Sequence, residues 1–412
     1  MFRCRYALSI TLAATLISAA TAADATWPAF RGADQLGIYT GKPLPTQWSA
    51  NDIKWRTQLD GTGFSSPCIW NERTFVTTAK KAGDKVTRSV ICLNTESGKI
   101  LWQKDVSTGP AEDTHAMNGY ASPTCATDGQ RVVSFFGRGG IHCHDMDGKP
   151  LWSHNLGEFP GVWGTAASPV IIDGKVIQNC DAAGPSFLTA FDAASGKVVW
   201  KTPRGSPPRG GWNTPLLIET DKRRELIVHG EHGVRGYDPA TGKELWFCKG
   251  FNGRGTPIPA WHKGLLLVIN GKPGDAFAVK PGGSGDVTKS HMVWHTKRSA
   301  GRDCSSPVVA GNMMFVVSMK GIATAYDAAN GKQLWQSKLK GIFTASPIVA
   351  GGLIYIQNEA GDTYVIEPGD TLKVKHTNTL GKRNGELFRG SMAPVDGRLY
   401  FRSTHAVYCI GK

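Results

Sequence analysis

The segment Asp192–Trp200 reads DAASGKVVW, and its pattern returns at Asp238–Trp246 (DPATGKELW), Asp327–Trp335 (DAANGKQLW) and Asn94–Trp102 (NTESGKILW). In every copy an Asp or Asn can accept hydrogen bonds from a tight turn, and the Gly can adopt the positive φ that a short hairpin requires. A short strand then ends at the Trp. Each copy therefore predicts a hairpin within a repeated unit.

Tryptophans mark the period of this repeat along the whole chain. Successive members are 41 to 50 residues apart. They are Trp55, Trp102, Trp152, Trp200, Trp246, Trp294 and Trp335. A fixed period of this length is typical of solenoids and propellers.

A second landmark, Ser-Pro or a close variant, follows the same period. It occurs at Ser66-Pro67, Ser122-Pro123, Ser168-Pro169, Thr214-Pro215, Thr256-Pro257, Ser306-Pro307, Ser346-Pro347 and Ala393-Pro394. An apolar run, a turn and further short strands follow each Pro, so each unit holds four strands, as in a propeller blade. The sequence predicts an all-β fold with almost no helix, an eight-bladed β-propeller of four-stranded blades over residues 52–412.

The last and the seventh units depart from the pattern. The last unit ends without its Trp strand, and IKWR (Ile53–Arg56) near the start of the chain can supply it. We therefore expect the N-terminal strand to close the ring, which removes an exposed sheet edge. In the seventh unit His376 stands near the place of the Trp, and we expect that blade to pack less tightly.

The N-terminus has the order of features of a signal peptide. Arg3 and Arg5 precede the apolar stretch 7–22, which ends in an A-x-A site, so residues 1–22 are the expected signal peptide, cleaved near Ala22. Cys4 precedes the apolar stretch and cannot be a lipidated cysteine after cleavage. We expect an exported, periplasmic or secreted protein that is not a lipoprotein.

Residues 23–51 are the expected N-terminal extension. We expect this segment to lie across the outside of the ring, with Trp27, Phe30 and Trp48 as its anchors.

Composition limits the classes of function. The 412 residues include 50 Gly and 13 Trp, are 41% hydrophobic and carry a net charge of +14. This rules out global disorder, and no apolar run reaches the roughly 18 residues of a transmembrane helix. Because basic runs of five are absent and export is expected, we expect no nucleic-acid partner. We expect a monomer.

Eight cysteines remain after the expected cleavage, and we expect thiols at most of them. Cys92, Cys143 and Cys409 fall where other units place a small buried residue. There is no CxxC metal spacing, so we expect no metal site. His142 and His144 alternate on one strand and are interpreted as packing or solvent residues.

The pattern A-x-D-x-x-[TSN]-G-K-x-x-W at Ala190–Trp200 and Ala325–Trp335, with a variant at Gly236–Trp246, resembles the PQQ-like repeat family. WPAFRG (27–32), LPTQW (44–48) and IKW (53–55) look like exported members of it. That family includes pyrroloquinoline-quinone-dependent alcohol dehydrogenases and outer-membrane assembly factors of the BamB type. The resemblance implies a tryptophan-docking role, packing of one blade on the next, for all seven repeat tryptophans.

The loops before each Ser-Pro should surround the mouth of the central channel. They are rich in Gly, and Arg and aromatic residues interrupt them. The candidate ligand-binding residues are Trp163, Arg209, Trp212, Arg254, Arg302, Asp303 and Arg389. Arg binds carboxylate or phosphate in a fork, and aromatic rings offer flat contact surfaces. These loops predict a site for an anionic or extended partner, or else a solvated rim.

Three functions remain open from the sequence. The first is a non-catalytic binding or scaffold protein without a cofactor, which recruits envelope proteins as the BamB resemblance implies. The second is a PQQ- and calcium-dependent alcohol or sugar dehydrogenase, which the missing Cys-Cys pair disfavours. The third is glycan binding. Candidate polar groups for such a site stand on the loops after the second strands: Asn179, Asp181, Glu231, His232, Asn270, Asn358 and Glu359. A hard cation would need several oxygens among them to converge. No catalytic residue is assigned.

Overall fold

The computed structural model describes residues 25–161, 163–205, 212–250, 255–271, 274–298, 304–381 and 385–411. The expected signal peptide and its cleavage site lie outside these ranges. Among the described residues, no helix has the length and apolar character needed to cross a bilayer.

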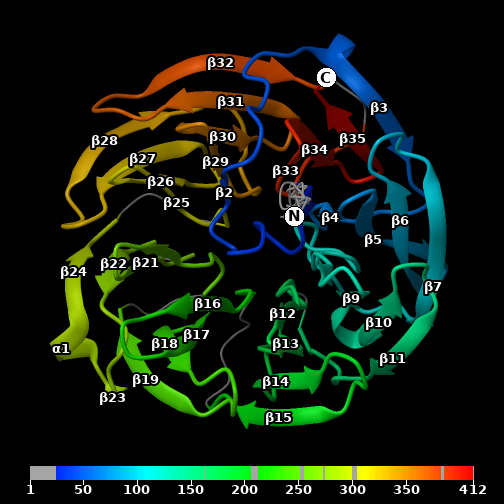
Figure 1. Cartoon of the computed structure of the whole chain (residues 1–412), viewed down its shortest axis with the longest axis horizontal. Coiled ribbons are helices and arrows are strands. Elements are labelled where there is room, and N and C mark those ends of the chain that lie inside the picture. The colour runs from blue at the N-terminus through cyan, green and yellow to red at the C-terminus, as the bar shows by residue number, and fades with distance from the viewer. Residues whose placement is uncertain are drawn as a thin grey trace, which may run out of the picture.

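Eight sheets stand in a ring, and each contains four antiparallel blade strands that lie side by side in order from the centre to the rim (Figure 1). The first blade consists of β4 (Cys68–Trp70), β5 (Arg73–Ala82), β6 (Lys85–Asn94) and β7 (Ile100–Pro110), and the second of β8 (Ala126–Thr127), β9 (Arg131–Phe135), β10 (Ile141–Asp145) and β11 (Pro150–His154). The third blade consists of β12 (Val170–Ile172), β13 (Lys175–Asn179), β14 (Phe187–Asp192) and β15 (Val198–Pro203), and the fourth of β16 (Leu216–Glu219), β17 (Arg224–His229), β18 (Gly233–Tyr237) and β19 (Glu244–Lys249). The fifth blade consists of β20 (Ala260–His262), β21 (Leu265–Ile269), β22 (Ala276–Val279) and β24 (Met292–Thr296), and the sixth of β25 (Val308–Ala310), β26 (Met313–Val317), β27 (Ile322–Asp327) and β28 (Gln333–Lys338). The seventh blade consists of β29 (Ile348–Ala350), β30 (Leu353–Gln357), β31 (Asp362–Glu367) and β32 (Lys373–Thr379), and the eighth of β33 (Ala393–Val395), β34 (Arg398–Arg402), β35 (Ala406–Ile410) and β3 (Ile53–Gln58). The predicted eight-bladed, four-stranded propeller is confirmed.

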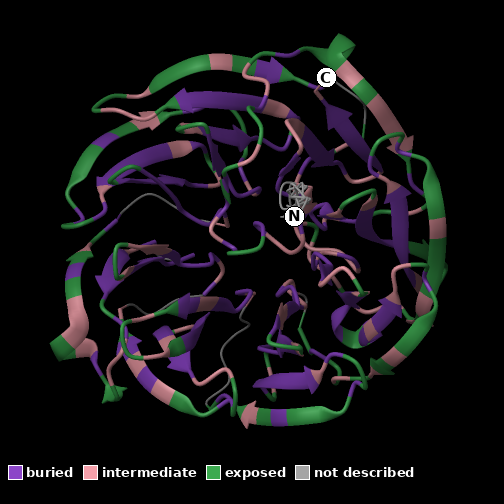
Figure 2. Cartoon of the chain, in the orientation of Figure 1, coloured by how far each residue is buried: buried purple, intermediate pink, exposed green. Residues whose placement is uncertain are grey.

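The remaining elements are short. Three two-residue strands join existing blades: β1 (Thr26–Trp27), β2 (Ile38–Tyr39) and β23 (Gly285–Asp286). The described helices are η1 (Ala50–Asp52), η2 (Gly137–Gly139) and α1 (Thr288–His291). The core lies in the inner three strands of each blade, whereas the outermost strands contain many solvent-exposed residues among the buried ones (Figure 2).

The N-terminal strand closes the ring as the sequence predicts. β3 pairs antiparallel with β35, and Trp55 lies opposite Cys409. The eighth blade thus combines residues from both ends of the described chain, and β3 covers the edge that β35 would otherwise expose.

Most repeat tryptophans contact the Gly-containing turn of the next blade. The indole Nε1 of Trp152 donates to the Ala193 carbonyl at 2.9 Å, and that of Trp294 donates to the Ala328 carbonyl at 3.2 Å. Trp246 differs, because its Nε1 donates to the Glu225 carboxylate at 2.6 Å. The fifth blade has β23 and α1 in place of the short turn, so the usual acceptor is absent from the described residues there.

The N-terminal extension does not lie outside the ring, and this expectation was wrong for residues 26–39. β1 pairs with β4 and β2 pairs with β29, which are the innermost strands of the first and seventh blades. The segment therefore crosses the centre of the ring (Figure 1). The physical reason is that its polar side chains find backbone carbonyls there: Arg31 Nη2 donates to Pro307 O at 2.8 Å, and Gln35 Nε2 to Pro215 O at 2.6 Å.

The extension then reaches the junction of the seventh and eighth blades, where the repeat lacks its Trp. Trp48 is buried there, with its ring centroid 6.1 Å from that of Phe401. Its backbone N–H donates to Asn378 Oδ1 at 2.9 Å. An indole from the extension thus packs beside β32, the strand on which His376 stands near the place of the repeat Trp.

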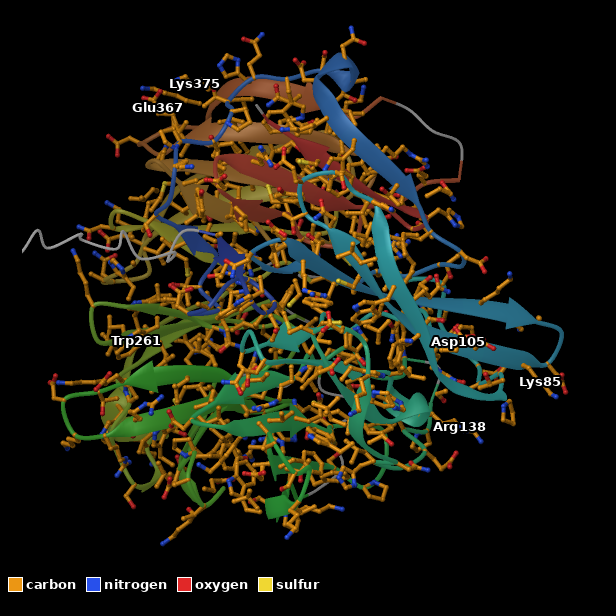
Figure 3. All side chains as sticks on the ribbon, turned by 45° about the vertical axis from the view of Figure 1, so that its right-hand side comes forward. Lys85, Asp105, Arg138, Trp261, Glu367 and Lys375 are labelled. Atoms are coloured by element: carbon orange, nitrogen blue, oxygen red, sulfur yellow. The ribbon has the colours of Figure 1, made fainter. Side chains whose placement is uncertain are left out.

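The first blade has the longest strands, and its hairpin projects from the ring. β5 and β6 pair from Arg73–Asn94 to Ala82–Lys85. Figure 3 shows Lys85 at the tip, far from the centre.

The described cysteines are all free thiols, and Cys92, Cys143 and Cys409 are fully buried. Burial raises the pKa of Cys92 and Cys143 to about 12, so these thiols are protonated packing groups.

Candidate functional site

A ring of buried hydroxyl groups surrounds the channel where the innermost strands begin. Each hydroxyl oxygen accepts a hydrogen bond from a backbone N–H of the preceding blade, over 2.8–3.0 Å. The members are Ser66, Thr124, Ser168, Thr214, Ser306, Ser346 and Ser391. We call these seven residues the hydroxyl ring. In the fifth blade Ile258 takes the equivalent place and supplies only its N–H.

The hydroxyl ring explains why a Ser or Thr recurs before Pro in the repeat. In two blades, however, the ring residue is not the one directly before that Pro. Thr124 follows Pro123 and Ser391 precedes Pro394 by three residues. The repeat therefore reveals where the ring lies, whereas these register shifts become visible only in the folded backbone.

A cavity of about 220 Å³ opens at this ring, and aromatic side chains form much of its wall. Phe64, Trp163 and Trp212 come from the loops before the innermost strands, and Phe30 comes from the extension. Trp163 stacks on His115 with centroids 4.0 Å apart and meets Trp212 edge-on at 6.5 Å. The Trp212 Nε1 donates to the Gly164 carbonyl at 3.1 Å, which fixes the indole.

One ion pair lies at the rim of this cavity. Arg389 Nε lies 3.0 Å from Glu359 Oε1, and both side chains are largely buried. The guanidinium also stacks over Phe64 at 5.0 Å, and its Nη1 donates to the Ala116 carbonyl at 2.6 Å. Thr344 Oγ1 donates to the same Glu359 oxygen at 3.0 Å. Arg389 is thus held in one position by contacts on every side.

The extension crosses the channel deeper than the hydroxyl ring. It pairs with Ile69 and Val349, which follow the ring members Ser66 and Ser346 by three residues. Arg31 is buried here and forms hydrogen bonds to three carbonyls. Burial lowers its pKa to about 9, so the guanidinium is charged at neutral pH.

The predicted site residues divide into two groups. Trp163, Trp212 and Arg389 line the same cavity. Arg209, Arg254, Arg302 and Asp303 lie outside the described residues. The sequence analysis missed Phe64, Asn118 and the hydroxyl ring, although the Ser-Pro repeat was a visible signal for the last of these.

The proposed calcium ligands do not gather into a site for calcium and a quinone. Asp181 Oδ1 binds Arg204 Nε at 2.7 Å, and Asn179 Nδ2 donates to Asn213 O at 2.9 Å. Glu359 binds Arg389, as described above. Across the described residues, no cluster of three or more His, Cys, Asp or Glu side chains could hold a metal. The acidic members of the candidate set therefore do not meet at one point, as the ligands of a hard cation would.

The two alternating histidines are packing residues in this structure. His142 Nε2 lies 2.7 Å from the Gly139 carbonyl, and the buried His144 ring lies 6.4 Å from Trp102. Burial lowers the pKa of His144 to about 4, which keeps its ring neutral near pH 7.

Comparison with known proteins gives one family match across nearly the whole chain. The family model described as "Outer membrane protein assembly factor BamB" matches residues 17–207, 87–249, 147–293 and 230–408.

Three curated relatives show how widely the repeat is used. A tetrathionate hydrolase of Acidithiobacillus ferrooxidans is 26% identical over 65% of this chain and 53% of its own length. A polyvinylalcohol dehydrogenase of Pseudomonas is 25% identical, with 47% and 35% covered. BamB of Burkholderia pseudomallei is 24% identical, with 65% and 64% covered. The chain thus spans between a third and two thirds of these relatives' lengths.

Among solved structures, BamB from Moraxella catarrhalis matches with a TM-score of 0.61 and 16% identity. The match covers 87% of this chain and 96% of that one. At this identity the similarity supports the propeller fold alone.

Proposed function

The chain belongs to the family described as outer membrane protein assembly factor BamB, and from this membership we propose an exported, non-catalytic binding protein of the cell envelope. It holds a partner at the channel mouth, against the aromatic wall formed by Phe64, Trp163 and Trp212. Export rests on the N-terminal features 1–22.

The Arg389–Glu359 pair carries this proposal. Arg389 is the one charged side chain among the described lining residues, and Glu359 neutralises it. A general acid or base needs a titratable group that faces the substrate. Apart from the Cys304 thiol and Arg389, the described cavity offers rigid aromatic surface and uncharged polar groups, which suit binding.

The test is capture of envelope proteins by the purified mature protein and by variants of its wall. Trp163→Ala combined with Trp212→Ala should weaken binding of a captured partner by about 700-fold, because aromatic anchors that a partner covers contribute about 2 kcal/mol each. Trp261→Ala is the control, since Trp261 on β20, labelled in Figure 3, is not among the residues that line the cavity. Equal loss of binding in both variants would contradict the proposal.

A titration with pyrroloquinoline quinone, with and without calcium, addresses the dehydrogenase alternative. We expect no saturable binding and no thermal shift at high micromolar quinone. Calcium-dependent binding would overturn the non-catalytic proposal and would call for an alcohol and sugar oxidation screen. Binding of oligosaccharides that depends on Trp163 and Trp212 would instead favour a glycan-binding propeller.

A further inference from the structure

The hydroxyl ring has hydrogen-bond donors that the protein does not use. A Ser or Thr hydroxyl has one proton to donate besides the lone pairs that accept hydrogen bonds. All seven ring oxygens accept an N–H, as described above. Within the described residues, none of the seven hydroxyl protons has a hydrogen-bond acceptor in the protein.

These unused donors are buried and face one space. Every member of the hydroxyl ring lines the 220 Å³ cavity. Their side chains are 2–4% exposed, so bulk water solvates them poorly. A group that accepts hydrogen bonds from several sides can compete with water for these seven donors at once.

Positive charge lies on both sides of the ring. Arg389 lies at the rim, and Arg31 donates from beneath to the carbonyl of Pro307, the residue after Ser306. Arg31 has no ion-pair partner among the described residues. Glu359 offsets Arg389, and Asp34, which acts to raise the pKa of Arg31, partly offsets Arg31, so two guanidinium groups with acidic neighbours flank the hydroxyl groups.

We propose that the hydroxyl ring is an oxyanion site, which takes the carboxylate of a small acid whose apolar body contacts Trp163 and Phe64. This inference rests on the proposed binding function and names the ligand class for its site. Each ring oxygen already accepts one N–H and has an unused proton, so the ring offers donors that an oxyanion can accept without having to donate in return. The cavity volume is below the roughly 300 Å³ at which drug-sized ligands begin, which favours a compact ligand.

The test is calorimetric titration of the mature protein with benzoate and, separately, with benzyl alcohol. The two probes share the aromatic ring, and only benzoate carries an oxyanion. We expect saturable binding of benzoate and at least tenfold weaker binding of benzyl alcohol, because hydrogen bonds to charged groups are the stronger ones. Equal affinities, or no benzoate binding, would overturn the proposal. This comparison needs no variant.

Two adjacent serines supply a matched pair of variants. Ser306→Ala removes a ring hydroxyl, whereas Ser305→Ala removes an equally buried hydroxyl that donates to the Ala345 carbonyl and does not line the cavity. Ser306→Ala should weaken benzoate binding about tenfold, and Ser305→Ala should leave it unchanged. The same loss in both would show that folding, rather than the ring, controls binding.

Two further arms separate the sources of the carboxylate and the two proposals. N-acetylleucine, titrated beside benzoate, distinguishes a peptide carboxyl terminus from a free aromatic acid. Capture of an envelope partner without benzoate binding would reject the oxyanion site and leave the proposed function standing. Benzoate binding without any captured partner would support the oxyanion site and reject the proposed binding of an envelope protein.

Discussion

The contact between a repeat Trp and a Gly of the next blade explains two features of the motif at once. Gly331 has φ of 72°, and a Cβ built on it would lie 2.4 Å from the Trp294 ring. Gly98 with Trp55 and Gly242 with Trp200 repeat this geometry. Glycine is therefore needed both for backbone conformation and for close approach of the indole.

Gly331→Ala tests the second of these needs. It should lower the free energy of unfolding by about 2–5 kcal/mol, since left-handed backbone costs about 1–2 kcal/mol and overpacking about 1–3 more. Urea denaturation followed by tryptophan fluorescence measures this change.

Gly311→Ala is the control, because Gly311 also has positive φ, 63°, but nothing lies within 4 Å of its Cβ position. It should cost about 1–2 kcal/mol, from the backbone alone. If the two variants lose the same stability, the Trp contact makes no contribution of its own.

The extension is the element that joins the most distant parts of the ring. It pairs with the first and seventh blades through β1 and β2. Arg31 and Gln35 bind carbonyls of the sixth and fourth blades. The Tyr39 hydroxyl accepts the Gly397 N–H of the eighth blade at 3.1 Å.

Arg31→Met should loosen this crossing while the blades stay folded. The substitution leaves the Gln35, Leu36 and Pro307 carbonyls without their donor, at a local cost of about 2–4 kcal/mol. Hydrogen–deuterium exchange should rise in residues 26–39 and stay constant in β30 and β31. The exposed Lys42, whose partner is Asp396, gives the control variant Lys42→Met, with no change expected. Unchanged exchange in Arg31→Met would show that strand pairing alone holds the segment.

The repeat made the blades predictable, whereas the path of the extension was not. Trp and Gly carry the blade signal in their identities, so the period, the blade count and the closing strand Ile53–Arg56 could be found. Arg31 and Gln35 bind backbone carbonyls, and a carbonyl has no signature in the sequence. The cavity could be predicted only in part, for the same reason. Trp163, Trp212 and Arg389 could be identified because Trp and Arg are typical of binding sites. The geometry of the hydroxyl ring could not, because it depends on the path of the backbone.

For the molecule as a whole, the buried histidines determine how stability responds to acid. Burial lowers the pKa of His229 to about 4, and its Nδ1 lies 3.0 Å from the Pro257 carbonyl. The unfolded side chain titrates near pH 6.5. Between these values the unfolded chain binds a proton that the folded ring excludes, so stability is complete above about pH 6.5 and falls as the pH drops toward 4.

His229→Asn should flatten this response. The loss of unfolding free energy between pH 7 and pH 5 should shrink by about 2 kcal/mol, since one pKa unit corresponds to about 1.4 kcal/mol. Urea titrations at the two pH values give this difference. The exposed His232 supplies the control His232→Asn, which should keep the wild-type slope. A wild-type slope in His229→Asn as well would assign the acid response to other groups.

The closing strand also has a consequence in time. Arg56 on β3 meets Tyr408 on β35 across 352 residues of chain. A chain that emerges N-terminus first exposes β3, Arg31 and Trp48 long before their partners exist. Contacts between such distant residues form slowly. β3, Arg31 and Trp48 therefore stay without these partners until the later blades have been synthesised. The last step of folding is then the pairing of the N-terminal strand β3 with β35. A holding factor that recognises this waiting segment would act before the ring exists, and its binding site would disappear when the ring closes.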